Sequence, residues 1–341
     1  MCRASSPVKC PNAMSNPTPS NVTPLAPLVV ILGPTASGKS ALAISLAERL
    51  NGEILVCDST QAYRHFNIGT AKVPVDAQRN IPHHLVDLIE PHEIFTAGDY
   101  RRRAEEVLVG LRLGRKLPIV TAGTGLYLQA LLEGLSDAPA RSDALREKLR
   151  RKATERGAEH LHRILAHLDR ESASRIAPRD TQKIIRAIEM RVLAGKSVGE
   201  IHGAGRARLE GYEVTKIGLL PARRALYARI DARVHSMLEA GWLDEVRQLI
   251  ARPVPADAKP FQFIGYSELR AHLEGRLALT DAVAQIQQAT RRFAKRQLTW
   301  FHKEPNVAWL AGFGDDPAIA SAGLARLTER WASGPVTFNE A

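Results

Sequence analysis

The chain has 341 residues, 45% of them hydrophobic, which is enough for one large domain or for one domain with a smaller domain inserted into it. No apolar run reaches the roughly 18 residues that a transmembrane helix needs, and this excludes a membrane-spanning protein of that kind. Its three cysteines, Cys2, Cys10 and Cys57, are not spaced as a zinc site or a disulfide framework. A reduced, cytoplasmic protein is therefore expected.

The formal net charge of +11 is concentrated in one part of the chain. Residues 141–210 hold 17 Lys and Arg residues against 10 Asp and Glu residues, whereas residues 28–140 are close to neutral. A focused basic surface is typical of a protein that binds a polyanion such as RNA. A solvated, charged helical face would give the same composition, and the charge alone favours that simpler interpretation.

The first 27 residues are rich in Pro, Ser and Asn and show no hydrophobic period. They also lack the apolar core of a secretory signal, so residues 1–27 are predicted to form a disordered tail.

From residue 28 to residue 140, short apolar runs alternate with amphipathic ones. Strands are predicted at residues 28–32, 53–57 and 117–121, and helices at residues 40–50, 98–113 and from 125 to about 133. This alternation is typical of an α/β fold with a parallel sheet and helices on both faces.

The pattern changes at about residue 141. Residues 141–205 are basic and helical without strands, which predicts an all-helical insertion domain. Strand character returns at residues 214–220, and further helices follow. We therefore assign residues 28–140 and 206–315 to the α/β core domain and residues 316–341 to a C-terminal tail.

The motif GPTASGKS fits the template G-x-x-x-x-G-K-[ST] of a P-loop, and it follows an apolar strand and opens a helix, as that motif requires. Backbone N–H groups and the helix N-terminus would bind the oxygens of a diphosphate. The Lys39 ammonium would neutralise phosphate charge, and the Ser40 hydroxyl would hold Mg²⁺. The predicted diphosphate-binding residues are Gly33, Pro34, Thr35, Ala36, Ser37, Gly38, Lys39 and Ser40.

Asp58 ends the second predicted strand, whereas the third strand runs into residues 122–125 without a carboxylate. Ligands of open parallel sheets bind at the carboxyl ends of the strands, so Asp58 is expected beside the P-loop. Its carboxylate could act as a general base toward a second substrate. It could instead bind a metal or cap a turn, and position alone leaves these alternatives open.

Three further stretches are less specific. Residues 58–72 interleave polar, aromatic and basic side chains, which suits nucleotide recognition but also an ordinary surface loop. His83 and His84 are adjacent, so both cannot face one metal from a strand, and a structural role is expected. Residues 290–301 form an amphipathic helix whose basic side could face solvent or phosphates.

Several blocks in the same order resemble the bacterial tRNA dimethylallyltransferase family, which is the tRNA A37 isopentenyltransferase family. The resemblance covers residues 28 to about 310. It is carried by GPTASGKS, DSTQAYRHFNIGTAK, HHLVD, FTAGDYRR, AGTGLYLQALLEGL, IGY and TRRFAKRQLTWF. The P-loop alone would be weak support, but the blocks together are specific. A P-loop NTPase-like fold is implied.

The resemblance implies transfer of a dimethylallyl group from dimethylallyl diphosphate to N6 of adenosine 37 in tRNA, with Mg²⁺ at Ser40. Asp58 would be the general base, and Thr35 and Arg229 would act at the diphosphate. The implied tRNA-binding residues are Asp58, Ser59, Thr60, Gln61, Thr124, Arg146, Gln182, Lys183, Ile184, Ile185, Arg186, Gly265 and Tyr266. A monomer that binds the anticodon stem-loop is expected.

The chain departs from the family at Thr60 and Ala62, where bulkier residues are common, and this could alter contacts with the base. It has no cysteine after Cys57, so the zinc module of eukaryotic members is missing. Three other functions remain open from the residues: a small-molecule P-loop kinase that uses ATP, an adenylate isopentenyltransferase, and an RNA-binding module with an inactive P-loop.

Overall fold

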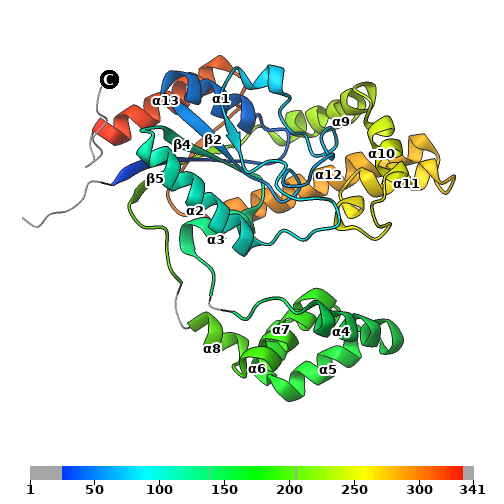
Figure 1. Ribbon diagram of the computed structural model, residues 1–341. Coiled ribbons are helices and arrows are strands. Elements are labelled where there is room, and N and C mark those ends of the chain that lie inside the picture. Colours follow the sequence, from blue (N-terminus) through cyan, green and yellow to red (C-terminus); the bar gives the residue numbers. More distant parts are fainter. Residues whose placement is uncertain (1–24, 137, 204–205, 333–341) are drawn as a thin grey trace, which may run out of the picture.

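The computed structural model describes residues 25–136, 138–203 and 206–332. Within these residues, six strands form one parallel sheet with the order β3-β2-β4-β1-β5-β6 (Figure 1). The α/β fold predicted from the sequence is thereby confirmed. The strands are β1 (Ala26–Leu32), β2 (Gly52–Cys57), β3 (His83–His84), β4 (Leu117–Ala122), β5 (Tyr212–Leu219) and β6 (Val307–Leu310).

The central strand β1 supplies hydrophobic side chains to both faces of the sheet, because successive residues of a strand point to opposite sides. Val29 and Ile31 pack in the core beneath α1 and α13, and Val30 and Leu32 pack in the core beneath α2 and α3. No helix of the described residues is long and apolar enough to cross a membrane. The covering helices are α1 (Lys39–Arg49), α2 (Ala97–Leu113), α3 (Gly125–Glu133) and α13 (Pro317–Ala332).

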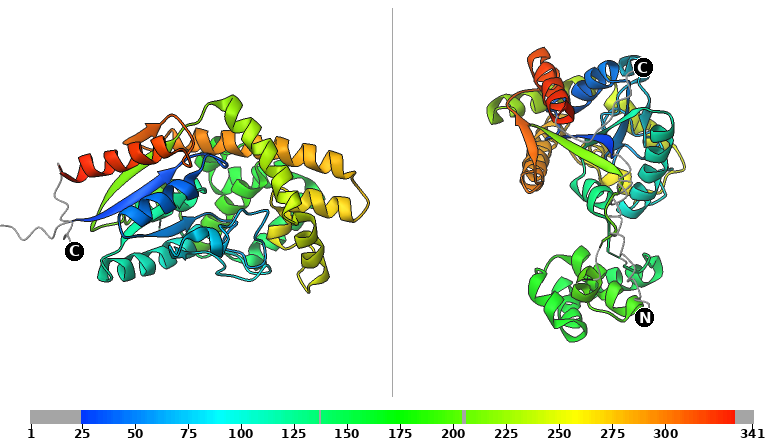
Figure 2. Two further views of the ribbon diagram at one scale, coloured as in Figure 1. Left: turned by 90° about the horizontal axis from the view of Figure 1, so that it is seen from above. Right: turned by 90° about the vertical axis from the view of Figure 1, so that its left-hand side faces the viewer.

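The prediction of a C-terminal tail at residues 316–341 is wrong for the part that the structure describes. Helix α13 begins at Pro317, and it packs along α1 (Figure 2, left). Leu327 is fully buried there among α1 and sheet side chains. The amphipathic period of this segment carries the signal, and its apolar face covers a core that would otherwise be exposed to water.

The predicted N-terminal tail is also too long, because Ala26 and Pro27 already belong to β1. They pair with Tyr212 and Glu213 of β5, which extends the sheet beyond the apolar run that starts at Leu28. The rest of the predicted tail, residues 1–24, and residues 333–341 lie outside the described residues.

Beyond the carboxyl ends of the strands lies a helical layer with a core of its own. Its largest buried side chains include Trp242 and Tyr266, and Tyr63 and Phe66 from the segment after β2 join the same core. This layer therefore holds the segment after β2 against the sheet domain. Its helices are α9 (Arg223–Glu239), α10 (Trp242–Ala251), α11 (Tyr266–Leu273) and α12 (Leu279–Phe301).

The basic segment folds as five helices among the described residues, between α3 and β5 in the chain. They stand apart from the sheet domain (Figure 2, right). Their own core includes the buried side chains of Leu149, Leu161, Leu165, Ile184 and Ile188. The helices are α4 (Asp143–Arg156), α5 (Ala158–Leu168), α6 (Arg170–Arg175), α7 (Thr181–Ala194) and α8 (Val198–Gly203).

We predict that Leu327→Ala destabilises the protein by about 2–5 kcal/mol, because it removes buried methyl groups and leaves a cavity between α13 and α1. Urea unfolding would measure the free energy. Arg326→Ala is the control on the same helix, because Arg326 is exposed and pairs with Glu329 at the surface. The control should change the free energy by less than about 0.5 kcal/mol. Equal effects of the two substitutions would contradict a packed role for α13.

Candidate active site

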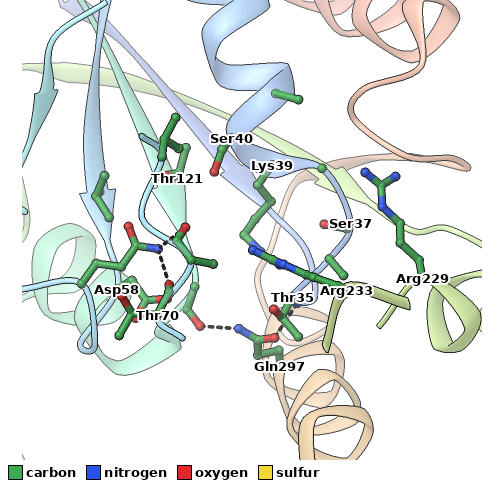
Figure 3. A pocket seen from close by; sticks show the side chains of 18 of the residues that line it. Thr35, Ser37, Lys39, Ser40, Asp58, Thr70, Thr121, Arg229, Arg233 and Gln297 are labelled. Carbon is green, nitrogen blue, oxygen red and sulfur yellow. Dashed lines mark hydrogen bonds between the residues drawn. The ribbon is translucent and has the colours of Figure 1, made fainter. Parts of the chain in front are cut away.

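The carboxyl ends of β1, β2 and β4 open into a pocket of about 520 Å³ (Figure 3). Parallel strands bring the loops that follow them to one edge of the sheet, and this edge is where such folds bind ligands. Residues of α9 and α12 close the pocket on the opposite side. The polar residues of the lining are Thr35, Ser37, Lys39, Ser40, Asp58, Gln61, Thr70, His83, Thr121, Arg229, Arg233, Ser236 and Gln297.

The P-loop between β1 and α1 depends on a glycine that no other residue could replace without strain. Gly38 has φ 88°, and a Cβ there would lie 2.7 Å from the backbone nitrogen of Gly314. The loop after β6 closes on the P-loop at this point, where Gly314 N–H donates to the carbonyl of Ser37 at 2.9 Å. The sequence motif is thus held from both sides, by α1 and by the segment after β6.

Lys39 lies folded against the P-loop. Its Nζ donates to the carbonyl oxygens of Gly33 and Pro34, both at 2.9 Å. Burial lowers the pKa of the Lys39 ammonium to about 8, while the negative charge of Asp58 raises this pKa and the positive charge of Arg233 lowers it. Two carbonyls are weak partners for a charge in this setting, so an anionic ligand would stabilise the ammonium further.

Asp58 follows β2 and presents one free carboxylate oxygen. Its Oδ1 accepts hydrogen bonds from Thr60 N–H at 2.9 Å and from Thr60 Oγ1 at 2.7 Å. This oxygen therefore caps the turn after β2, which was one of the alternatives for Asp58. Its Oδ2 accepts no hydrogen bond from any residue that the structure describes. A Cβ on Gly123 would lie 2.4 Å from Oδ2, so only glycine leaves room for it. Asp58 is therefore both oriented and available as a base.

The residues next to Asp58 form one polar cluster with the β4–α3 turn. Ser59 N–H donates to Thr124 Oγ1 at 3.0 Å, and Gln61 lines the pocket while its Nε2 donates to the carbonyl of Thr70 at 3.1 Å. The structure thus brings Thr124 next to Ser59, 65 residues away in sequence. Ala62 is buried in the core and does not line the pocket, so of the two departures from the family only Thr60, which bonds Asp58, has a side-chain contact with a predicted site residue.

Arg229 and Arg233 reach the pocket from α9, one helical turn apart. Arg229 makes a two-pronged ion pair with Asp315, at 2.7 and 3.0 Å, and its guanidinium lies over the ring of Phe313. Arg233 forms no ion pair or hydrogen bond with any described residue, and burial together with the charge of Arg229 lowers its pKa. It lines the pocket beside Lys39 (Figure 3).

Arg233 is thus an uncompensated cation in a cleft, which is a position that suits an anion. The sequence offered Arg224, Arg229 and Arg233 as arginines that could reach a diphosphate, and we assigned only Arg229 to the site. The spacing i, i+4 on one helix is the signal that could have found Arg233, because such residues lie on the same face.

The second residue missing from the predicted set is Gln297. From α12, its Oε1 accepts a hydrogen bond from Thr35 N–H at 2.7 Å, and its Nε2 donates to the carbonyl of Gly123 at 2.7 Å. The P-loop and the β4–α3 turn are therefore joined by one buried side chain. Gln297 lies within the block TRRFAKRQLTWF, but the block does not indicate its role, since its partners are distant in sequence.

Comparisons with known proteins agree with this geometry. A family described as IPP transferase matches residues 61–304, and one described as isopentenyl transferase matches residues 26–80. A tRNA dimethylallyltransferase from Solibacter usitatus is 47% identical over 303 residues, covering 89% of this chain and 98% of the relative. One from Koribacter versatilis is 49% identical over 87% of this chain and 96% of the relative. The chain belongs to the tRNA dimethylallyltransferase family.

Solved structures place it in the same family. The full-length tRNA isopentenylpyrophosphate transferase from Bacillus halodurans has a TM-score of 0.65 with 34% identity, covering 90% of this chain and 98% of that one. A eukaryotic dimethylallyltransferase acting on tRNA has a TM-score of 0.75, covering 92% of this chain and 81% of that one; at 24% identity it supports the fold alone. The P-loop NTPase-like fold, predicted from the resemblance, is confirmed.

The residues of α7 that the tRNA dimethylallyltransferase resemblance linked to tRNA divide into two groups. Gln182 and Lys183 are exposed, whereas Ile184 and Ile185 are buried in the core of the insertion. The prediction that these two isoleucines contact tRNA is therefore wrong for their side chains. Helical geometry explains the error, because four consecutive positions of a helix cannot share one face.

Arg146 and Arg186 both bind the buried carboxylate of Glu189. Arg146 donates to it at 2.9 and 2.7 Å, and Ser142 N–H adds a hydrogen bond at 2.8 Å. Although burial opposes the charged form, the hydrogen bonds from Arg146, Ser142 and Arg186 lower the pKa of Glu189 to about 2. This cluster fixes the start of α4 to α7, so both arginines hold the insertion together and are only partly exposed.

Tyr266 is fully buried, and its hydroxyl donates to Glu245 Oε1 at 2.6 Å. A Cβ on Gly265 would lie 2.0 Å from the ring of Trp242. The predicted tRNA contact is therefore wrong for the side chain of Tyr266, which packs inside the helical layer. In the sequence, a glycine required by close packing and a buried aromatic residue after it look the same as a binding motif, which explains the error.

Helix α12 has one buried face and one basic face, as the amphipathic pattern predicts, and a phosphate-contacting role for the basic face stays a prediction. Ala294, Gln297 and Phe301 are buried. The outer face forms a shallow basic groove with the half-exposed indole of Trp300. The groove residues are Arg292, Lys295, Arg296, Thr299, Trp300 and Lys303.

The two adjacent histidines, His83 and His84, follow η1 (Val75–Gln78). His84 Nε2 contacts Glu53 Oε2 at 2.7 Å, which is the structural role expected for this residue.

We predict that diphosphate binding weakens as pH rises through 8, because Lys39 then loses its charge. A pKa near 8 leaves Lys39 mostly protonated at pH 7 and mostly neutral at pH 9, so the charged fraction falls about tenfold and the affinity for diphosphate should fall with it. Calorimetric titration with inorganic pyrophosphate at both pH values would measure the affinity. Lys39→Met is the control, since the ligand titrates identically with both proteins. An affinity ratio that stays constant with pH would contradict the assignment.

Proposed function

We propose that this protein transfers a dimethylallyl group from dimethylallyl diphosphate to N6 of adenosine 37 in tRNA, next to the anticodon. The observation that carries the proposal is one pocket with two chemically opposite ends. A P-loop with Lys39 and the unpaired Arg233 forms the first end, and the free Oδ2 of Asp58 forms the second. The names of the close relatives support both substrates.

The cationic end suits the diphosphate as a leaving group. The residues at the start of α1 line the pocket, and Lys39, Arg233 and the helix dipole would oppose the negative charge that grows on the departing oxygen. Arg229 is already neutralised in part by Asp315, so it acts at the edge of this site. Preorganised charges lower the barrier because they need no reorientation as the C–O bond breaks.

The site also fits a magnesium ion. The described residues contain no group of three or more His, Cys, Asp or Glu side chains that could hold a metal by themselves. Mg²⁺ in phosphate sites is commonly held by few protein ligands, with water and the substrate's phosphates completing the shell. The Ser40 hydroxyl, which lines the pocket next to Lys39, would hold the ion. The ion would supply positive charge to the diphosphate.

The acceptor end needs a base for one proton. As a bond forms between N6 and C1 of the prenyl group, the C1–O bond breaks and its electron pair leaves with the diphosphate. The proton from N6 passes to Asp58 Oδ2, so charge and atoms balance. An allylic carbon tolerates developing positive charge, which lets a weakly nucleophilic amine react. Thr60 holds Oδ1 and thereby fixes the direction of Oδ2.

A base inside a stacked anticodon loop must leave the stack to reach this pocket. The exposed basic residues of the insertion and the groove on α12 would bind the phosphates of the anticodon stem-loop. Phosphate contacts of this kind position the RNA, while Asp58 and Gln61, which line the pocket, would contact the target base together with the adjacent Ser59, Thr60 and Thr124. We propose a monomer as the active unit, acting in the cytoplasm.

The rival functions need different substrates. A P-loop kinase would consume ATP with a small acceptor, and an adenylate isopentenyltransferase would accept a free nucleotide. An RNA-binding module would bind tRNA without chemistry. Incubation of the protein with unmodified tRNA, Mg²⁺ and dimethylallyl diphosphate, followed by mass spectrometry of the digested nucleosides, separates these cases. An adenosine heavier by one C₅H₈ unit supports the proposal, and ATP consumption without this product overturns it.

We predict that Asp58→Asn lowers the rate of prenyl transfer roughly 10²–10⁴-fold, which is the usual contribution of a general base. The amide keeps an oxygen for the two hydrogen bonds from Thr60, so the turn should persist. Nucleoside mass spectrometry over time measures the rate, and filter binding measures tRNA affinity. Affinity should stay within about threefold of wild type. A variant with full activity would exclude Asp58 as the base.

We predict that Arg233→Gln raises KM for dimethylallyl diphosphate at least roughly tenfold, because a charge-assisted contact is lost. The KM for tRNA should not change. Arg224→Gln is the matched control on the same helix, because Arg224 is exposed and lies outside the pocket lining. A raised KM for tRNA with an unchanged KM for the prenyl donor would place Arg233 at the acceptor end instead.

A further inference from the structure

One wall of the pocket is formed by an irregular segment, residues 58–73, which we call the wall segment. Gln61, Thr70, Ala71 and Val73 of this segment line the pocket. The segment contains two non-glycine residues with left-handed backbone, His65 at φ 70° and Ala71 at φ 56°. Such conformations are unfavourable on their own, so the surroundings must hold the segment in place.

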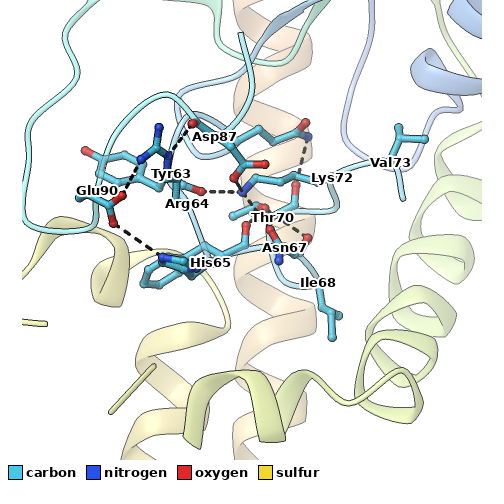
Figure 4. A network of polar contacts seen from close by, with 12 residues as sticks. Tyr63, Arg64, His65, Asn67, Ile68, Thr70, Lys72, Val73, Asp87 and Glu90 are labelled. Atoms are coloured by element: carbon cyan, nitrogen blue, oxygen red, sulfur yellow. Dashed lines mark hydrogen bonds and ion pairs between the residues drawn. The ribbon is translucent and has the colours of Figure 1, made fainter. Parts of the chain in front are cut away.

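Lys72 holds the wall segment together from within (Figure 4). Its Nζ donates to the carbonyl of Tyr63 and to Asp87 Oδ1, both at 2.5 Å, and to Asn67 Oδ1 at 3.0 Å. Only 8% of the Lys72 side chain is exposed, so these contacts satisfy a nearly buried ammonium. They tie the segment to itself and to Asp87, but they do not tie it to the helical layer.

Besides the packing of Tyr63 and Phe66 in its core, the helical layer holds the wall segment by a polar link, the carboxylate of Glu245 on α10. Its Oε2 accepts hydrogen bonds from the N–H groups of Asn67 at 2.9 Å and Ile68 at 2.8 Å. Its Oε1 accepts from Gly69 N–H at 3.5 Å and from the hydroxyl of Tyr266 at 2.6 Å. Three successive backbone N–H groups thus converge on one carboxylate, an arrangement that binds anions well.

Trp242, one turn before Glu245, fixes the distance between α10 and the wall segment. A Cβ on Gly69 would lie 2.2 Å from its Nε1, and a Cβ on Gly265 would lie 2.0 Å from its Cζ2. The indole is therefore sandwiched between the wall segment and the start of α11, and it is nearly fully buried. The backbone of residue 69 can reach Glu245 only because neither neighbour of the indole has a side chain.

From Glu245 a chain of contacts leads into the pocket. The amides of residues 67–69 precede Thr70, whose carbonyl accepts the hydrogen bond from Gln61 Nε2 at 3.1 Å. Gln61 lies three residues after Asp58, on the acceptor side of the pocket. Glu245 thereby contributes, through the amides of residues 67–69, to the position of Thr70 and of the Gln61 side chain bonded to it.

We propose that Glu245 is a positioning residue for the acceptor side of the pocket. It touches no pocket surface itself, and it acts by holding the wall segment so that Gln61 faces the incoming adenosine. This inference rests on the proposed function for its kinetic part, whereas the anchoring of the wall segment can be tested without any substrate. The P-loop lies on the other side of the pocket and has no contact with Glu245, so binding of the prenyl donor is unaffected.

The test compares Glu245→Gln with Asp244→Asn, its exposed neighbour on α10, which pairs only with Arg247 at the surface. Hydrogen exchange measured by mass spectrometry should show faster exchange, by roughly tenfold, for peptides covering residues 67–71 in Glu245→Gln, because a charge-assisted acceptor is replaced by a neutral amide. A peptide from α1 serves as the internal reference. Asp244→Asn should exchange as wild type does.

Kinetics with dimethylallyl diphosphate and unmodified tRNA give the second measurement. For Glu245→Gln, kcat/KM for tRNA should fall roughly tenfold, in line with the loss of a charged hydrogen bond, while KM for dimethylallyl diphosphate stays within about twofold. Tyr266→Phe removes only one of the four contacts and should produce a smaller change in the same direction. It also keeps the test available where Glu245→Gln fails to fold.

Unchanged exchange at residues 67–71, or unchanged kcat/KM for tRNA despite faster exchange, would overturn the proposal. Equal losses for both substrates, accompanied by a large fall in Tm, would also overturn it in favour of a general structural role. If the wild-type protein forms no prenylated adenosine, the proposed function fails, and the exchange experiment still decides whether Glu245 anchors the wall segment.

Discussion

The side-chain amide of Gln297 is the interaction on which the rest of the pocket depends. It bridges Thr35 N–H of the P-loop and the Gly123 carbonyl of the β4–α3 turn, with both contacts at 2.7 Å. Gly123 in turn leaves the space for Asp58 Oδ2. One buried group therefore sets the separation between the site for the leaving group and the base. A buried amide without partners would cost about 1–3 kcal/mol for each lost contact, so the bridge also stabilises this arrangement of the P-loop and the β4–α3 turn.

The part of the site that the sequence predicted is the part built from local contacts. A P-loop is a strand, a turn and a helix in succession, and Asp58 could be placed because the ends of parallel strands meet at one edge. Residues that act through distant partners left no such pattern. Gln297 contacts a residue 262 positions away, and Glu245 contacts one 178 positions away. Gln297 lies in a block that resembles the family, but neither its neighbours nor those of Glu245 indicate what the side chain contacts.

Burial explains the errors in the predicted tRNA contacts. A motif records which residues are required, and a requirement can come from packing as well as from binding. Ile184 and Ile185 pack in the core of the insertion, and the Tyr266 hydroxyl donates a hydrogen bond to Glu245. The exposed partners on the same elements, such as Lys183, carry the charge that an RNA would meet. The C-terminal helix α13 was missed for a related reason, since its polar residues hid an apolar face that covers α1.

The α/β core and the helical layer contribute opposite sides of one reaction site. The sheet supplies the P-loop and Asp58, which directly follow β1 and β2. The helices supply Arg233, Gln297 and, through Glu245, the wall segment. Because the cationic residues Arg229 and Arg233 lie on the same helical layer as Glu245, a shift of this layer would move the diphosphate contacts and the acceptor wall together. In the proposed reaction, the two ends of the pocket are thus coupled through the apolar packing of the helices, for example of Leu226 and Ile230 on α9 with Ala294 on α12. A substitution in this packing should affect both substrates, whereas loss of the Glu245 carboxylate releases the wall segment alone.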